Sequence, residues 1–486
     1  MRIGAKGKFG LFAATVVVAL SIFILNGRPL IYYDTAGYLE QGARLVGLFA
    51  PSPEAPVTST SEPGPPAEPQ KQVDKDVVGS RAAVYGFILE VVTILVGLPG
   101  MIAFNLGAIW LAVWIFARRL VAESGPALDV GVVTAIGLLS ASLGSLPFYV
   151  AFLMPDIFAP ILILLVAVLA VYSDRLTRQE LIVVVLLSLL AIVVHPSHLL
   201  LAILLAPIAT FASPLVSGRR LKLALLLTVV LVGAGLTEKF VFGMAVERFM
   251  HKRVVYLPFL TARLIDDGPG RTYLASRCPD PSYPTCALFE ALSASDDPTR
   301  FDAPNIVFAR TPQRGSYQHL SDEQRFAVAE DQIRFLGDVL TADPVGVAAA
   351  VVDNIATQLA YFSVEMTIPA PDTLVAASKI TNQLPVSLGN GHLVSPQPPW
   401  TGALYVAQGL VYGASLVVLA FLALRRQISR ASVTVLFIVL GGIVANAVVC
   451  GAVSEPAHRY GARVMFLLPL LAAMFWIARR PPQSRH

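Results

Sequence analysis

Two aspartates and an arginine stand out because each borders a long apolar run. Asp34 lies in IYYDTAGYLEQG (31–42), directly after the first apolar run, and Asp156 lies in FYVAFLMPDIFAP. Arg459 opens the last apolar run, in SEPAHRYGARV. A carboxylate can accept a proton from a hydroxyl nucleophile, and a guanidinium can hold a phosphate through two parallel hydrogen bonds. These residue types suit the transfer of a group that leaves from a phosphate.

The composition indicates where such chemistry would take place. Apolar residues make up 55% of the 486 residues and charged residues only 14%, whereas a soluble protein normally carries about 25% charge. Repeated apolar stretches of roughly 17–25 residues can each cross a hydrocarbon core of about 30 Å. We therefore predict an all-α polytopic membrane protein. The net charge of +4 is small and gives no indication of nucleic-acid binding.

About ten membrane spans are predicted, so both chain ends should lie on one side. The first run has the basic start and apolar body of a signal peptide, but no small-x-small cleavage site follows, and we expect it to remain as a span. The stretch 82–98 is nearly long enough to span, but we expect an interfacial helix there. The predicted spans are 8–26, 100–117, 128–147, 157–173, 180–194, 197–216, 221–241, 402–424, 432–453 and 463–478.

Basic residues gather on the side of the chain ends. The terminal segments and short loops of that side hold sixteen Lys and Arg residues but only four acids. The positive-inside rule assigns such a side to the cytoplasm. We therefore predict a multi-pass protein of a bacterial inner membrane with an active periplasmic face. The basic residues are Arg2, Lys6, Lys8, Arg118, Arg119, Arg175, Arg178, Arg219, Arg220, Lys222, Arg425, Arg426, Arg430, Arg479, Arg480 and Arg485.

The spans and long loops divide the chain into three parts. Residues 1–242 form an N-terminal transmembrane module with outer-face loops, and 401–486 carry the C-terminal transmembrane helices. Between them, 243–400 is long enough for a mostly helical periplasmic domain. Within the first outer loop, 51–76 is rich in Pro, Ser and Thr and lacks large apolar residues, which predicts a disordered insert.

Local signals support helices and a disulfide in the 243–400 domain. Ser321 and Gln324 read as a capping box that opens a helix to about 341, and the Asp343-Pro pair starts a second helix. Cys278 and Cys286 are a close pair on an oxidising face, which favours a disulfide. Metal binding by this pair is the alternative, although no His or Cys partners cluster with it.

The polar residues that border apolar spans all fall on the predicted outer face. His195 and His198 lie in the turn of IVVHPSHLL. Each residue alone has a simpler explanation: an aspartate can cap a helix, a histidine beside a proline can be structural, and an arginine can snorkel to headgroups. Independent caps and snorkels should distribute over both faces, whereas ionisable groups gathered at one membrane face usually mark a functional cavity.

Three segments resemble the glycosyltransferase C superfamily, which comprises polyprenyl-phosphate-sugar-dependent membrane enzymes such as protein O-mannosyltransferases and lipid A aminoarabinose transferases. YYDTAGYL is similar to the first-loop segment in which an aspartate is the general base. SRAAVYGFIL (80–89) resembles the stretch that returns to the membrane, and HRYGARVMFLLPL resembles the opening of the last span. The likeness covers about two thirds of the chain. Thr35 follows Asp34, so the paired Asp-Glu dipeptide of the first loop is missing.

The resemblance implies a sugar transferase that uses a polyprenyl-phosphate-linked donor and a lipid, glycan or protein acceptor. Asp34 and Asp156 would be catalytic, and the same two carboxylates would hold a divalent cation, Mg²⁺ or Mn²⁺, if the reaction needs one. A lipid or polysaccharide transporter, and a non-catalytic subunit of surface-polysaccharide assembly, remain alternatives. The expected substrate-binding residues are Tyr33, Tyr38, Glu40, Arg81, Tyr85, His195, His198, Glu455, His458, Arg459 and Tyr460.

Overall fold

The computed structural model describes most of the chain. The predicted insert 51–76, apart from Asp76, and Arg81 lie outside the described residues. The described residues are 4–49, 76–79, 82–124, 128–212, 221–251, 253–278, 280, 282–371, 373, 391–393 and 398–479.

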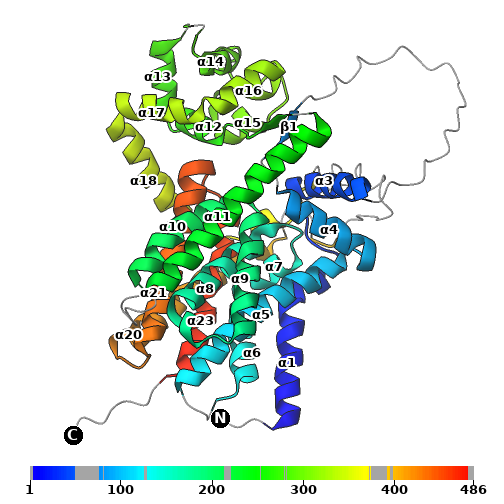
Figure 1. Cartoon of the computed structure of the whole chain (residues 1–486), viewed down its shortest axis with the longest axis vertical. Coiled ribbons are helices and arrows are strands. Elements are labelled where there is room, and N and C mark those ends of the chain that lie inside the picture. Colours follow the sequence, from blue (N-terminus) through cyan, green and yellow to red (C-terminus); the bar gives the residue numbers. More distant parts are fainter. Residues whose placement is uncertain are drawn as a thin grey trace, which may run out of the picture.

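The described chain is mainly helical, and a bundle of apolar helices forms its larger part (Figure 1). Every predicted span overlaps at least one of these helices. The bundle helices are α1 (Ala5–Ala19), α2 (Ser21–Asn26), α5 (Pro99–Ser124), α6 (Val130–Ala141), α7 (Leu146–Ala151), α8 (Phe158–Tyr172), α9 (Arg178–Val193), α10 (Pro196–Ala212), α11 (Leu221–Ala245), α20 (Trp400–Leu424), α21 (Arg430–Val448), α22 (His458–Met465) and α23 (Leu467–Ile477).

Six helices of the described chain are long and apolar enough to cross a membrane. The other four predicted spans correspond to shorter or interrupted helices: α1 and α2 break at Leu20, α6 and α7 are separate, α9 has 16 residues and α10 has 17. The protein is thus an all-α membrane protein. The six segments are Pro99–Ser124, Pro155–Arg175, Val229–Arg248, Trp400–Leu424, Arg430–Ser454 and His458–Ile477.

The core of the bundle is centred on α8. All fifteen residues of this helix are buried, because its apolar side chains surround the whole helix and α5, α9, α10 and α21 pack around it. The bundle has two different ends. The chain ends lie at one of them, called the termini end here, and a second group of helices covers the opposite end, called the domain end (Figure 1).

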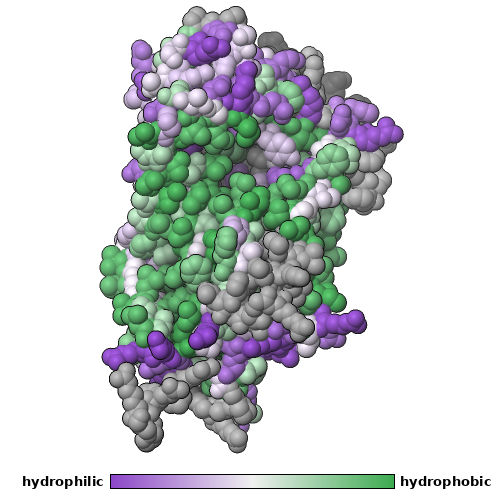
Figure 2. All heavy atoms as spheres, turned by 60° about the vertical axis from the view of Figure 1, so that its left-hand side comes forward, coloured by the Kyte–Doolittle hydropathy of each residue, from purple (hydrophilic) through white to green (hydrophobic). Residues whose placement is uncertain are grey.

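The surface of the bundle is an apolar belt between two hydrophilic ends (Figure 2). At the termini end, acidic side chains form ion pairs with arginines of the predicted basic loops. Arg119 lies 2.8 Å from the Glu180 carboxylate, and Arg175 lies 2.6 Å from that of Glu123. The belt has the form of a membrane-embedded surface.

Two helices lie across the bundle near its domain end. In Figure 1, α3 (Tyr33–Phe49) and α4 (Ala83–Val96) run at a large angle to α1. They pack tightly because glycines face each other: a Cβ on Gly42 would lie 2.2 Å from the carbonyl oxygen of Gly86. The stretch 82–98, for which an interfacial helix was predicted, forms α4. The last turn of this helix exposes apolar side chains such as Leu95, which is 74% exposed.

A second hydrophobic core lies beyond the domain end. Its side chains come from residues between Leu257 and Val351. Strand β1 (Asp76–Val78) pairs in parallel with β2 (Arg253–Val255), and this joins the first long loop to the second core. The helices are α12 (Phe259–Asp266), α13 (Pro269–Arg277), α14 (Thr285–Ser293), α15 (Ala303–Phe308), α16 (Asp322–Glu330), α17 (Gln332–Ala342) and α18 (Pro344–Ala360).

The local helix signals in this region are largely confirmed, with one correction. The Ser321 capping box is formed, and the Asp343 side chain accepts the N–H of Gly346 at the start of α18. The single helix predicted to about 341 is wrong, because α16 ends before Asp331 and α17 begins after it. The buried Asp331 carboxylate accepts a hydrogen bond of 2.8 Å from Thr285 of α14, a tertiary contact that the sequence pattern does not reveal.

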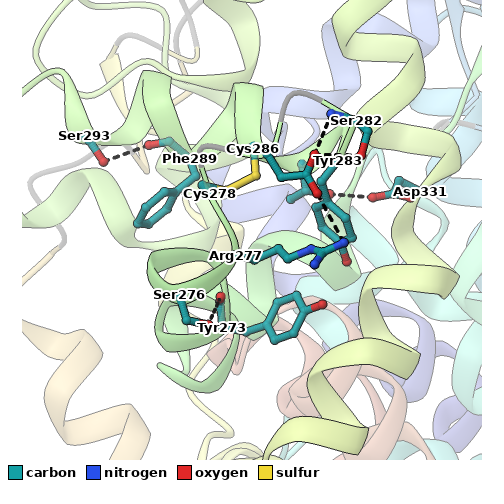
Figure 3. The surroundings of a disulfide bond; sticks show 12 residues. Tyr273, Ser276, Arg277, Cys278, Ser282, Tyr283, Cys286, Phe289, Ser293 and Asp331 are labelled. Carbon is teal, nitrogen blue, oxygen red and sulfur yellow. Dashed lines mark hydrogen bonds and ion pairs between the residues drawn. A yellow bond between two sulfur atoms is a disulfide. The ribbon is translucent and has the colours of Figure 1, made fainter.

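Cys278 and Cys286 form a disulfide that links the end of α13 to the first turn of α14 (Figure 3). Tyr273 and Tyr283 pack beside it, with ring centroids 6.1 Å apart. The Tyr283 hydroxyl donates a hydrogen bond of 2.8 Å to Asp338. The disulfide therefore joins two helices that also share packing contacts.

Candidate functional site

Backbone pairing brings the segment of Asp34 to the loop of Asp156. The Leu30 N–H donates to the carbonyl of Ala151, and the Leu153 N–H donates back to Leu30, both at 2.8 Å. The buried Thr35 hydroxyl donates to the Leu153 carbonyl at 3.1 Å. These contacts place the start of α3 beside the 3₁₀ turn Pro155–Ile157, which carries Asp156.

Asp156 forms a buried ion cluster with Arg459, in the first turn of α22, and Arg463, in its last turn. Its Oδ1 atom lies 3.3 Å from Arg459 Nε and 3.4 Å from Arg463 Nη1. Asp156 and Arg463 are 0% exposed and Arg459 is 2% exposed. Arg463 also donates to the Asn446 side-chain oxygen, at 2.8 Å from Nη2. Two guanidinium groups thus share one carboxylate, which leaves the cluster with an excess positive charge.

The hydrogen-bonding capacity of this cluster is only partly used. Within the described chain, Asp156 Oδ2 and the Nε and Nη1 atoms of Arg459 are buried without a hydrogen-bond partner. Burying an ionised group without partners is costly. Arg463 is better satisfied, because Asn446 and Cys450 both accept from it. Arg459 is therefore the member of the cluster that could accommodate an anion.

Tyr32 is surrounded by the charged groups of this region. The Arg459 guanidinium carbon lies 4.2 Å from the centre of the Tyr32 ring. Burial raises the pKa of the Tyr32 hydroxyl, Arg459 acts in the opposite direction, and Asp34, Asp156 and Glu455 raise the pKa further. All four charged groups therefore interact electrostatically with this ring.

Asp34 lies in the first turn of α3 and is partly exposed. A carboxylate in the first turn is favoured by the helix dipole. The helix begins at Tyr33, so Asp34 lies within it and does not precede it as a cap residue would. Arg459 interacts electrostatically with both Asp34 and Asp156. Of the two predicted catalytic aspartates, Asp34 is thus the one within reach of a ligand in solution.

The two histidines lie beside the ion cluster. Their ring centroids are 5.1 Å apart. His198 is fully buried, and its Nδ1 contacts the Ala191 carbonyl at 2.7 Å. His195 interacts electrostatically with Arg463 and Arg459. The turn between α9 and α10 therefore belongs to the same polar region as Asp156.

The predicted tyrosines and Glu40 fall into two groups. Tyr38 and Tyr85 are buried edge to face with centroids 4.9 Å apart, and Tyr85 interacts electrostatically with Asp156. Tyr33 is 51% exposed, and Glu40 forms an exposed ion pair with Arg44. Tyr85 thus lies toward the cluster, whereas Glu40 is engaged along its own helix.

Glu455 and His458 lie at the junction with the second core. The His458 ring stacks on Tyr361 with centroids 4.2 Å apart and accepts the Ser363 N–H at 3.0 Å. Burial raises the pKa of Glu455 to about 7, with Asp266 and Asp302 of the second core acting in the same direction. These two residues connect the bundle to the second core.

Some residues of the cluster were not among the predicted substrate-binding residues. Tyr460 was predicted, and both arginines lie over its ring, at 4.9 and 5.1 Å. Arg463, Asn446 and Tyr32 were not predicted as site residues. An asparagine within an apolar span is a recognisable signal, because such polar groups are rare at membrane depth. Tyr32 carries no such signal, since its role depends on the turn before α3.

The ion cluster is poorly suited to a cation. Asp156 already faces two guanidinium groups, which would repel a divalent ion. Within the described residues, no group of three or more His, Cys, Asp and Glu side chains could hold a metal. Arg459 and the carboxylates of Asp156 and Asp34 therefore lie in one polar region.

Comparisons with protein-family models, with curated proteins and with solved structures find no match for this chain.

Proposed function

We propose that the protein is an integral membrane glycosyltransferase that moves a sugar from a polyprenyl-phosphate donor to a hydroxyl-bearing acceptor. The observation that carries the proposal is the arrangement around Tyr32: a buried arginine with unused donors lies on one of its ring faces, and Asp34 is within electrostatic reach. An anion site next to a carboxylate is what transfer from a phosphate requires.

The roles of the residues follow from their surroundings. Asp34 would take the proton of the acceptor hydroxyl as its oxygen attacks the anomeric carbon. The bond between that carbon and the phosphate oxygen breaks, and the phosphate leaves with the bonding electrons, next to Arg459. Asp156 would act as a positioning residue, because it is buried and paired with both arginines.

Access to Arg459 would require the Tyr32 ring to move. The contact between this ring and the guanidinium is of the kind that contributes roughly 0.5–2 kcal/mol. A phosphate that forms two charge-assisted hydrogen bonds with Arg459 would offset this loss. Tyr32 would therefore cover the anion site when no donor is bound. The donor side of the proposal is a lipid phosphate, since Arg459 lies at the start of the membrane-competent segment His458–Ile477.

A lipid or polysaccharide transporter is the second candidate, and a non-catalytic assembly subunit is the third. A transporter should place its polar groups near the middle of the membrane. The ion cluster instead lies in the Pro155–Ile157 turn before α8 and in α22, the first part of the segment His458–Ile477. The membrane orientation in this proposal, with the domain end in the periplasm, rests on the basic residues of the termini end.

The experiment is transfer of a labelled sugar from a polyprenyl phosphate by the purified full-length protein in vesicles. Label that appears on a new acceptor supports the proposal. Label that crosses the vesicle membrane and stays on its original lipid identifies a transporter. If a panel of sugar donors and acceptors yields neither result, while the folded protein still binds partner proteins of the cell envelope, the assembly subunit replaces the transferase.

A further inference from the structure

A pocket lies between α11, the turn from α9 to α10, and β2, and it shares His195 with the polar region around the ion cluster. It is open to the surface and is not a closed cavity. In Figure 1, the upper end of α11 rises to the level of β1, at the domain end. Residues that line the pocket include Ala83, Ile192, His195, Glu238, Lys239 and Tyr256.

The pocket arises from the way α11 approaches its neighbours. Gly235 allows close packing, because a Cβ there would lie 2.8 Å from both Ile192 and Leu199. One and two turns later, the same face of α11 presents Glu238, Lys239 and Phe242 to the pocket. The adjacent face is exposed and apolar, as expected for contact with lipid, and consists of Leu236, Phe240, Val241 and Met244.

The carboxylate of Glu238 and the ammonium group of Lys239, which both line the pocket, remain available to bind a ligand. Glu238 forms no hydrogen bond or ion pair with any residue that the structure describes, and it interacts electrostatically with Lys239, its neighbour in the chain. Lys239 lies over the Tyr256 ring, with its Nζ 5.0 Å from the centroid, and forms no ion pair within the same described residues. Charged side chains next to apolar helices are expensive and usually have a ligand or a partner.

His195 adds a directed donor. Its Nδ1 accepts the Ser197 N–H at 3.2 Å and contacts the Ser197 hydroxyl at 2.7 Å. Burial, and then the charges of Arg463, Arg459 and Lys239, hold the pKa of His195 well below its usual range. A neutral ring whose Nδ1 accepts a hydrogen bond carries its proton on Nε2. The pocket therefore combines two donors, Lys239 and His195, with one carboxylate acceptor.

We propose that this pocket binds the headgroup of a zwitterionic phospholipid, with its phosphate at Lys239 and His195 and its ammonium group at Glu238. A lone phosphate would leave Glu238 as a repelling neighbour, and a lone ammonium would meet the same difficulty with Lys239. The apolar face of α11 beside the pocket accounts for the acyl chains. The inference uses none of the residues to which the proposed transferase assigns a role, and its test leaves His195, which also adjoins the ion cluster, unchanged.

The test measures lipid binding to the full-length protein, purified in phospholipid-free detergent, by native mass spectrometry. Phosphatidylethanolamine should bind to the wild-type protein, and Glu238→Gln should weaken its binding roughly tenfold, because one charge-assisted contact is lost. Binding of phosphatidylglycerol, which lacks the ammonium group, should not weaken with Glu238→Gln. Lys239→Gln should weaken the binding of both lipids.

Two matched controls come from the same end of α11. Glu247 and Arg248 are an exposed charged pair just beyond the pocket, so Glu247→Gln and Arg248→Gln should leave binding unchanged. Ala83→Leu should fill the pocket without changing any charge, and it should reduce phosphatidylethanolamine binding as much as Glu238→Gln does. This variant keeps the test valid if Glu238→Gln fails to fold.

Several outcomes would overturn the proposal. Unchanged phosphatidylethanolamine binding in Glu238→Gln, Lys239→Gln and Ala83→Leu would show that the pocket is not the site. Equal losses in Glu247→Gln would mean that general surface charge controls binding. Soluble phosphoethanolamine that binds as tightly as the lipid, with the same dependence on Glu238, would assign the pocket to a soluble ligand.

Discussion

Arg459 has three kinds of neighbour: the Asp156 carboxylate, the Tyr32 and Tyr460 rings, and the more distant Asp34. Its flat, forked guanidinium can stack on a ring and donate hydrogen bonds at its edge at the same time. A lysine could carry the charge but could not do both. This geometry explains why an arginine, rather than any cation, is useful at this position.

Arg459→Lys should therefore weaken binding of a polyprenyl-phosphate sugar by roughly tenfold or more, because the two-pronged contact with phosphate is lost while the charge remains. Arg248→Lys, an exposed position at the same end of the molecule, is the control and should bind normally. Titration of a labelled donor against both purified variants provides the measurement. Equal affinities in the two variants would assign Arg459 a purely structural role.

The raised pKa of Glu455 predicts that the free energy of unfolding depends on pH. Its pKa in the folded protein is about 7, against an ordinary value of 4.5, because burial disfavours the charged form. Between these values the folded protein holds a proton that the unfolded chain has lost, so the free energy of unfolding should fall as pH rises through this window. The fall should be at most on the order of 3 kcal/mol.

The measurement for Glu455 is the melting temperature between pH 4.5 and pH 7. Glu455→Gln should flatten the decrease, since glutamine does not titrate. Glu290→Gln, at an exposed position of α14, should leave the slope as in the wild-type protein. A Glu455→Gln slope that matches the wild-type slope would mean that other groups cause the pH dependence.

Residue types and positions alone singled out several residues of the candidate site, but did not show how they contact one another. Asp34, Asp156, Arg459 and Tyr460 border apolar runs, so their unusual position is visible in the sequence. That Asp156 is buried between two arginines depends on Arg463, one helical turn after Arg459, and on the packing of distant helices. The distances from Asp156 to these two arginines are not visible in the sequence. The sequence therefore could not show that Asp156 is buried and Asp34 is accessible.

Close helix packing joins the bundle to the second core at α18 and α22. The Gln358 side chain holds both backbone groups of Ala457: its Nε2 donates to the carbonyl at 3.0 Å, and its Oε1 accepts the N–H at 2.9 Å. A Cβ on Gly461 would lie 1.7 Å from the Tyr361 carbonyl oxygen. The glycine therefore sets how closely the segment bearing Arg459 approaches the end of α18.

Gly461→Ala should lower the stability of the protein by about 1–3 kcal/mol, because α18 and α22 must separate to admit the methyl group. Gly413→Ala is the matched change, since Gly413 is also helical and nothing lies within 4 Å of its Cβ position. It should be neutral or slightly stabilising. Thermal unfolding in detergent compares them, and equal melting temperatures would contradict the packing described here.

At the level of elements, apolar runs and capping signals predicted helices well, whereas their breaks and neighbours were not predictable. The Asp331 interruption depends on Thr285, and the pairing of β1 with β2 joins residues 177 positions apart in the chain, such as Asp76 and Arg253. Both contacts are tertiary. A local pattern can indicate that a helix forms, but not which distant side chain ends it.

The whole molecule has an apolar belt between a hydrophilic termini end and a hydrophilic domain end (Figure 2). The six membrane-competent helices agree with the predicted class. The native cysteines suit a topology test, because Cys278 and Cys286 are bonded and Cys450 is buried. A newly introduced, exposed cysteine should then be the main reactive thiol of the described chain.

We predict that Asp296→Cys reacts with a membrane-impermeant maleimide in intact spheroplasts, whereas Arg425→Cys reacts only after the membrane is disrupted. Both positions are exposed, the first beyond the domain end and the second at the termini end. The reason is the excess of basic residues in the short loops of the termini end. The opposite labelling pattern would place the domain end in the cytoplasm.

Sugar transfer by the Asp34→Asn variant tests the central claim most directly. Asparagine keeps the size of the side chain but cannot accept a proton, so transfer from a labelled polyprenyl-phosphate sugar should fall by about 10²–10⁴-fold while donor binding and melting temperature stay close to wild type. Glu247→Gln, at an exposed position without a role in the proposed transfer, should retain full activity. Near wild-type transfer by a folded Asp34→Asn protein would contradict the account.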